Sequence, residues 1–191
     1  MLVLLAIAAS TRTPGLSDVV SRDGRYRVVV AESPRHRITF DIVTQPGGSI
    51  LHRVVSNYQP YPDTETLARH EPANVEVYWS PESNYVAIDE AAYHHGGEVF
   101  LAEMRRGKTR EVGLPREAIV AATGRQWDRY RIRVEEGWVS EEELSLTLGG
   151  DAVQSYLPDG RHTLLNRTFE VRLWIHEGRA TLTSCRETTK S

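Results

Sequence analysis

The chain has 191 residues and a net charge of −3, with 40% hydrophobic and 26% charged residues. These values are ordinary for a globular domain and exclude a globally disordered chain. A chain of this length buries enough surface to fold as one domain without a metal or a disulfide. Basic and acidic residues are interspersed along the sequence, which argues against a nucleic-acid-binding protein.

The first ten residues form an apolar run that is too short to span a bilayer, so we expect no integral membrane span. The run is similar to the apolar part of a secretory signal, and Ala6 and Ala8 fit a small-x-small cleavage site. A positively charged segment before the run is missing. We expect a secreted or periplasmic protein, with a cytoplasmic location as the alternative. Residues 1–18 would form this segment and a linker, and residues 19–191 a single β domain.

Strand patterns dominate the first half of that domain. Three runs rich in Val and Ile predict an antiparallel meander at residues 25–32, 37–43 and 49–55. A polar stretch with three prolines, residues 56–72, predicts a surface loop. A second set of strands is expected at residues 74–79, 84–89, 98–104 and 109–114.

The second half begins with the one expected helix. Pro115 is favourable at the first helical position, Glu117 places a negative charge in the first turn, and Gly124 ends the segment. Further strands are expected at residues 130–134, 144–148, 163–176 and 179–186, of which the last two read as a closing hairpin. The sequence therefore predicts an all-β, mainly antiparallel fold with one short helix.

A turn-then-strand motif recurs along the chain. Its copies run from Val20 to Tyr26, from Trp79 to Tyr85 and from Trp138 to Leu144, so the starts at 20, 79 and 138 are separated by 59 residues both times. A partial fourth copy at residues 156–162 is out of step. In each copy an apolar residue ends one strand, turn-forming residues follow, and another apolar residue starts the next strand.

The second copy, which reads WSPESNYVAI from Trp79, resembles the W-S-P-D-G-x-Y repeats of TolB-like and WD40-like β-propellers. The resemblance implies blade-like meanders, which we expect near residues 20–55, 75–113 and 130–187. A closed ring takes about four to eight blades, and a WD40 blade spans roughly 40–45 residues. We therefore expect an open or incomplete propeller-like assembly, with a β-sandwich as the alternative.

Imidazole and carboxylate groups gather in the segment from Asp89 to Glu98, which also contains His94 and His95. These groups suit a divalent metal or acid–base chemistry. Adjacent histidines on an extended segment point to opposite sides, however, which disfavours chelation of one ion. The alternative is a solvated loop between two strands.

Three aromatic residues are candidate ligand-binding residues. Trp127 follows the expected helix among charged and polar residues, and Tyr58 and Tyr61 lie in the proline-containing loop. Aromatic side chains in loops can form a recognition surface. The alternatives are a core position for the tryptophan and a stiff connector for the loop.

No nucleophile elbow, phosphate-binding loop, dinucleotide fingerprint or zinc-protease motif occurs in the sequence. We expect no cofactor. The function that the sequence favours is a non-enzymatic module that binds another protein. Arginine supplies almost all the positive charge, with Lys only at Lys108 and Lys190, which indicates a GC-rich bacterial source. The alternatives are a hydrolase-like or metal-dependent site in the 89–98 segment and a structural accessory subunit.

Overall fold

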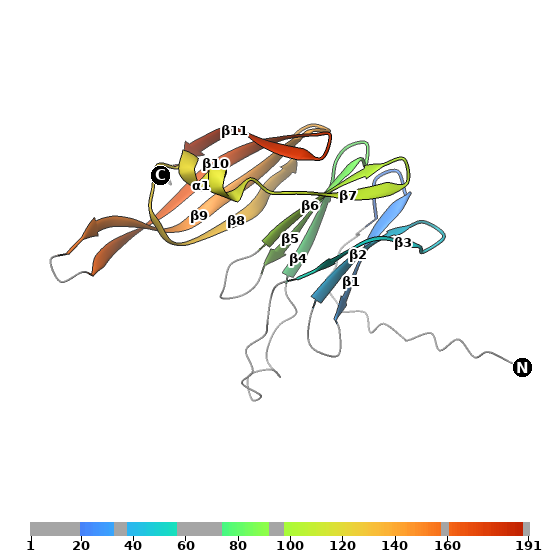
Figure 1. Cartoon of the computed structure of the whole chain (residues 1–191), viewed down its shortest axis with the longest axis horizontal. Coiled ribbons are helices and arrows are strands. Elements are labelled where there is room, and N and C mark those ends of the chain that lie inside the picture. Colours follow the sequence, from blue (N-terminus) through green and yellow to red (C-terminus); the bar gives the residue numbers. More distant parts are fainter. Residues whose placement is uncertain (1–19, 33–37, 57–73, 92–97, 158–160, 189–191) are drawn as a thin grey trace, which may run out of the picture.

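The computed structural model describes residues 20–32, 38–56, 74–91, 98–157 and 161–188. Within these ranges the chain is mostly antiparallel β-structure in three sheets, none of which closes into a barrel (Figure 1). The prediction of an all-β fold with one short helix is confirmed. Each sheet is a meander in which strands that are consecutive in sequence are neighbours in the sheet.

The sheets follow one another along the chain. The N-terminal sheet contains β1 (Tyr26–Glu32), β2 (Ile38–Thr44) and β3 (Ile50–Val55). The middle sheet contains β4 (Asn74–Trp79), β5 (Tyr85–Ala91), β6 (Glu98–Arg105) and β7 (Lys108–Val112). The C-terminal sheet contains β8 (Trp127–Trp138), β9 (Glu143–Tyr156), β10 (His162–His176) and β11 (Arg179–Glu187).

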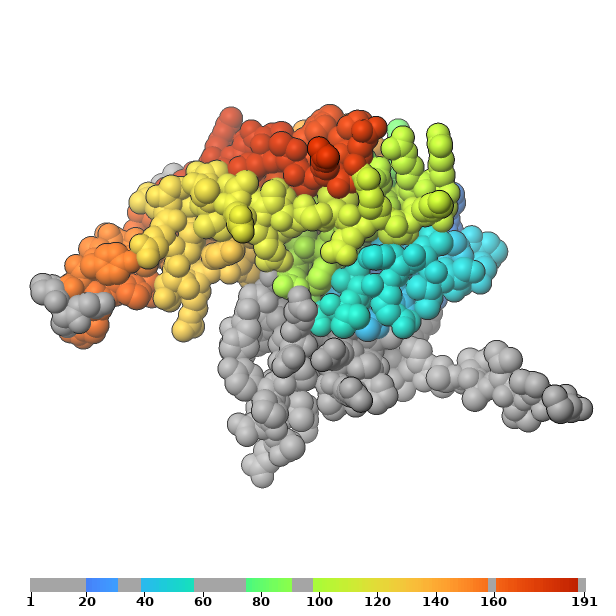
Figure 2. All heavy atoms as spheres, in the orientation of Figure 1, coloured from blue at the N-terminus to red at the C-terminus, as the bar shows by residue number. Residues whose placement is uncertain are grey.

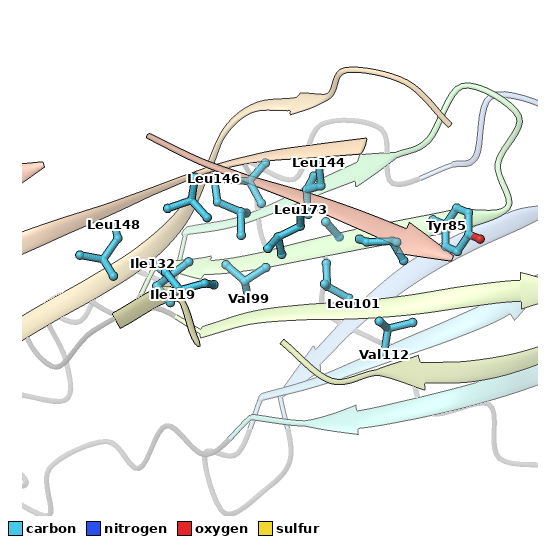
Figure 3. Packing of buried hydrophobic residues seen from close by; sticks show 14 of the residues in the cluster. Tyr85, Val99, Leu101, Val112, Ile119, Ile132, Leu144, Leu146, Leu148 and Leu173 are labelled. Atoms are coloured by element: carbon cyan, nitrogen blue, oxygen red, sulfur yellow. The ribbon is translucent and has the colours of Figure 1, made fainter. Parts of the chain in front are cut away.

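The middle sheet is the central layer and is buried on both faces. Because side chains alternate along a strand, β5 sends Tyr85 and Ala87 to one face and Val86 and Ile88 to the other. The first face packs against the C-terminal sheet around Leu144 and its buried neighbours (Figure 3). The second face packs against the N-terminal sheet. Two hydrophobic cores, one on each side of the middle sheet, therefore hold the three layers together.

The helix α1 (Arg116–Ala122) connects the middle sheet to the C-terminal sheet. Glu117 lies in its first turn, as the sequence predicts, whereas Pro115, expected at the first helical position, stands at the N-cap, one residue before it. Ile119 is fully buried in the core that the two sheets share. Gly124 follows with a φ of 61°, a left-handed conformation that glycine adopts without strain and that ends helices. The helix thus closes the side of this core.

The repeated motif forms the same turn in its first two copies. Ser21 N–H donates to Tyr26 O over 2.9 Å, and Ser80 N–H donates to Tyr85 O over 3.0 Å. In return, each tyrosine N–H donates to the serine Oγ over 2.9 Å. These pairs close the turn and leave its aromatic residue at the start of a strand.

The third copy is one residue shorter than the sequence predicts. Val139 N–H donates to Glu143 O over 2.8 Å, so Glu143, and not Leu144, takes the place of the tyrosines. The strand pairs agree with this alignment, because Val20 lies opposite Arg27, Trp79 opposite Val86 and Trp138 opposite Leu144. The sequence pattern aligned Leu144 with the two tyrosines because it is apolar. In the structure Leu144 lies on the opposite face of its sheet from Glu143 and packs into the core.

Consecutive copies contact each other across the layers. The ring of Tyr26 stacks on Trp79 with centroids 6.1 Å apart, and Tyr85 stacks on Trp138 at 5.5 Å. The Glu141 carboxylate accepts hydrogen bonds from Ser80 Oγ at 2.9 Å and from the backbone of the same turn. The tyrosine that follows the turn in one sheet therefore packs on the tryptophan that ends the first strand of the next sheet.

Candidate functional site

Two consecutive residues near the end of β5 have buried carboxylates. Asp89 and Glu90 are consecutive, so strand alternation sends them to opposite faces of the middle sheet. Their side chains are 0% and 1% exposed. Buried carboxylates are uncommon and need hydrogen-bonding partners, so their surroundings decide what they can do.

Asp89 faces β8, the edge strand of the C-terminal sheet. Its Oδ2 accepts a hydrogen bond from Arg133 Nε at 2.6 Å and another from the backbone N–H of Val134 at 2.9 Å. Burial raises the pKa of Asp89 above its ordinary value of 3.8, and these two hydrogen bonds oppose part of the rise. Asp89 thus joins two sheets by satisfying a backbone group that an edge strand leaves open.

A second arginine lies near this pair. Burial lowers the pKa of Arg131, the charge of Arg133 lowers it further, and Asp89 partly offsets both effects. Among the described residues, neither Arg131 Nε nor Asp89 Oδ1 has a hydrogen-bond partner, although both atoms are buried. Arg133 also lies 3.7 Å from a carboxylate oxygen of Glu76. Asp89 and the arginines around it therefore form an ion-pair network that holds the middle sheet to the C-terminal sheet.

Glu90 lies on the other face, toward the N-terminal sheet. Both of its carboxylate oxygens accept the Ser56 hydroxyl, at 2.8 and 2.7 Å. Burial raises the pKa of Glu90 above its ordinary value of 4.5, the hydrogen bond from Ser56 lowers it, and the charge of Glu98 raises it. No cation pairs with Glu90 in the described part of the chain, so the ionised form is poorly supported.

We predict that Glu90 makes the protein less stable as the pH rises. Unfolded Glu90 ionises near 4.5, whereas the folded protein resists its ionisation, so stability is lost from about that pH upward. Glu90→Gln cannot ionise, so it should remove this loss and be more stable than the wild type at pH 8. Urea unfolding of both proteins from pH 4 to pH 8 measures the difference, and parallel curves would contradict the prediction.

The structure separates the two described members of the predicted metal site. In the strand register Asp89 lies opposite Val99, while Glu98 lies opposite Glu90. Glu98 instead approaches Arg116 of α1, with 3.9 Å between the charged atoms. His94 and His95 lie outside the described residues, and so do Tyr58 and Tyr61. Within the described ranges no group of three or more His, Cys, Asp or Glu residues is placed to hold a metal ion.

A two-stranded ribbon projects from the far end of the C-terminal sheet (Figure 1), and its atoms stand out from the body of the molecule in Figure 2. The last β9 residue paired with β8 is Ala152, and β10 pairs with β11 only from Phe169 onward. Beyond these points β9 and β10 pair only with each other, as far as Tyr156 opposite His162. An isolated pair of strands is marginally stable in water, so this ribbon is poorly explained as a stabilising element.

Apolar side chains on the ribbon are exposed to solvent. Tyr156 is 61% exposed, Leu164 43% and Leu157 39%. The Tyr156 ring contacts His162 edge-on, with centroids 6.0 Å apart. Large apolar residues that gather on an exposed element indicate a binding surface more often than scattered ones do.

Trp127, the aromatic candidate among the described residues, lies at the base of this ribbon. It is half-buried, contacts Phe169 and Tyr130 edge-on, and donates from Nε1 to Thr123 Oγ1 over 3.0 Å. Tyr130 is 39% exposed. Trp127 therefore anchors the base of the ribbon, and Tyr130, Tyr156 and Leu164 are the more accessible apolar residues. No sequence pattern marks these three residues, because strand length and pairing, not residue type, expose them.

In the described part of the chain no helix is both long and apolar enough to cross a membrane. The chain was also compared with known proteins. No protein-family model, no curated protein and no solved structure matches it.

Proposed function

We propose that this protein is a non-catalytic module that binds another protein through the projecting ribbon of β9 and β10. The observation that carries the proposal is the exposure of Tyr156, Leu164 and the adjoining Leu157, at the end of the β9–β10 pair where these strands pair only with each other. The binding of a partner would cover these side chains and remove the cost of exposing them. Trp127 and Tyr130 lie near the base of the ribbon on the core-facing side of the sheet, whereas Leu164 and Tyr156 lie on the outward-facing side.

The chemistry at the end of β5 supports a binding function over catalysis. Asp89 accepts hydrogen bonds from Arg133 and from the β8 backbone, and Glu90 accepts one from Ser56. A general acid or base has to reach a substrate proton, whereas both of these carboxylates face packed sheets and are buried.

The scaffold for this module is a propeller-like stack of three blade-shaped meanders. Two features support this interpretation: successive sheets pack face to face, and the Tyr26–Trp79 and Tyr85–Trp138 stacks recur between them. We further propose an exported, envelope-located protein, on the strength of the apolar first ten residues. Fractionation of the source cells tests the location, and recovery in the cytosol alone would contradict it.

Site-specific photo-crosslinking tests the ribbon. A photo-reactive phenylalanine at Tyr156 of the full chain should give a discrete adduct in an envelope extract, because the side chain is exposed on the proposed surface. Leu164→Ser should abolish the adduct, since it removes apolar contact area from the same ribbon. The same photo-reactive residue at Lys108, exposed on the β6–β7 hairpin, is the control. No adduct at Tyr156, or the same adduct from both positions, would contradict the proposal.

A further inference from the structure

The two outer faces of the three-sheet stack differ from the faces inside it. On the face of the middle sheet that packs against the N-terminal sheet, the first cross-strand pair after the turn is Trp79 and Val86, and both residues are buried. The same positions of the N-terminal sheet, which face outward, are Val20 and Arg27. Val20 is 39% exposed, and Arg27 Nε is buried without a hydrogen-bond partner in the described part of the protein. An arginine therefore replaces a core valine at the first end of the stack.

The other end of the stack has the opposite charge. The residues that alternate with Tyr26 along β1 and with Tyr85 along β5, on the same face as each tyrosine, are largely apolar. The residues at the same positions of β9 are polar: Glu143, Ser145 and Thr147. Ser145 is 1% exposed, and its Oγ has no hydrogen-bond partner within the described ranges. A buried polar atom without a partner costs free energy. Each outer face thus carries one such atom.

The net charges of the two faces are complementary. The outward face of the N-terminal sheet and its adjoining turn carry four arginines and two aspartates: Arg22, Arg25, Arg27, Arg53, Asp23 and Asp41. Asp23 pairs with Arg25 and Asp41 with Arg53. Since four positive and two negative charges leave +2, this face attracts an acidic surface.

The outward face of the C-terminal sheet carries the matching excess of acid. We count the cross-strand neighbours of Glu143, Ser145 and Thr147 on this face, together with the adjoining bulge of β8, and leave out Arg133 because it is bound to Asp89. This region contains four glutamates and two arginines: Glu135, Glu136, Glu143, Glu170, Arg172 and Arg186. Arg172 lies between Glu136 and Glu170, at 3.0 and 2.6 Å. Four negative and two positive charges leave −2.

Exposed apolar side chains accompany the charges on both faces. Trp174, opposite Glu143 in the register, is 44% exposed on the outer face of the C-terminal sheet. Ile50 and Val55 are 54% and 45% exposed on the outer face of the N-terminal sheet. An interface needs buried apolar area as well as matched charge, and these residues provide it on both sides.

We propose that a second copy of this chain continues the stack head to tail. The C-terminal sheet of one copy packs on the N-terminal sheet of the other, and Glu143 pairs with Arg27 of the partner copy. This pairing follows from the contacts inside the chain, where Tyr26 lies over Trp79 and Tyr85 over Trp138. By the same rule Glu143 lies over Val20, which is paired with Arg27. The inference rests on the propeller-like stacking proposed above.

Two copies supply six sheets, a number within the range of about four to eight that closes a propeller ring. In such a ring each copy uses both outer faces, so the dimer has two identical head-to-tail contacts. The contact is electrostatic in part, and salt at 1 M shortens the screening length to about 3 Å. We therefore expect a dimer at low salt that dissociates as the salt concentration rises.

Charge reversal in two separate chains tests the contact. Arg27→Glu alone would place two glutamates together at both contacts of its dimer, and Glu143→Arg alone would place two arginines together. Each variant should dimerise at least about 100-fold more weakly than the wild type, because like charges in contact cost several kcal/mol. An equimolar mixture restores opposite charges at both contacts, so it should form a heterodimer with near wild-type affinity.

Sedimentation velocity on the full chain, from roughly 1 to 100 µM, measures these equilibria. The matched controls are Lys108→Glu and Glu117→Arg, which reverse exposed charges away from both faces; each should dimerise like the wild type. A wild-type protein that is monomeric throughout would overturn the proposal, since charged outer faces would then be terminal caps. A mixture that stays monomeric while the wild type dimerises would overturn it too. The crosslinking at Tyr156 does not depend on either result, so the two proposals can fail separately.

Discussion

Replacement of Trp79 by alanine is expected to destabilise the protein by about 3–5 kcal/mol. The indole is buried where the N-terminal and middle sheets meet, and it stacks on Tyr26. The truncation leaves a large cavity, because the strands on both sides are fixed by their hydrogen-bond ladders. It also removes the contact that sets one sheet on the next. Urea unfolding followed by tryptophan fluorescence and by circular dichroism measures the loss.

Tyr156→Ala is the matched control for this prediction. Tyr156 is also a large aromatic residue on a strand, but it is 61% exposed and outside both cores. Its replacement should change the free energy of unfolding by no more than about 0.5 kcal/mol, as is usual for surface positions. Equal losses from the two substitutions would show that the stacked aromatics do not hold the layers together.

Replacement of Asp89 by alanine should cost about 3 kcal/mol. Breaking a buried ion pair by removing one partner typically costs about 3–5 kcal/mol. We expect the lower end, because the Arg133 side chain is 31% exposed and can hydrate after its partner is lost. The substitution also leaves the backbone N–H of Val134 without its acceptor. Denaturant unfolding at pH 7 provides the measurement.

Glu76→Gln separates the Asp89 pair from the rest of the network. Glu76 approaches the same arginine at 3.7 Å, but its side chain is 53% exposed. Exposed ion pairs contribute about 0–1 kcal/mol, so this variant should lose no more than that. A loss as large as that of Asp89→Ala would mean that burial of Asp89 is not what makes its contact strong.

Strands were predictable from sequence where they cross the core and less so where they leave it. The expected strand at 144–148 corresponds to Leu144, Leu146 and Leu148, whose alternation the core imposes. The observed β9 extends to Tyr156, through two glycines and polar residues. That extension pairs with β10 outside the core, so no hydrophobic alternation marks it. The start of β8 at Trp127, earlier than expected, has another cause, since an irregularity in the register between Trp127 and Arg129 interrupts the alternation there.

The candidate site could be located from sequence only in part. Asp89 was singled out as a carboxylate near histidines, with a solvated loop as the alternative. In the structure it lies near the end of β5 and is fully buried under β8. The sequence could not show this, because Arg133 lies 44 residues away and reaches Asp89 only through the packing of two sheets. The pairing of Glu90 with Ser56 depends on tertiary packing in the same way.

The burial of both faces of the middle sheet also has a consequence for synthesis on the ribosome. The chain emerges N-terminus first, so β4 to β7 are available before β8, β9 and β10. Until those later strands appear, Tyr85, Val99, Leu101 and Val112 have no partner surface. Nascent chains in this state are prone to aggregation and are natural clients for chaperones. The order of the three meanders along the chain therefore delays protection of the larger core until β8, β9 and β10 have been synthesised.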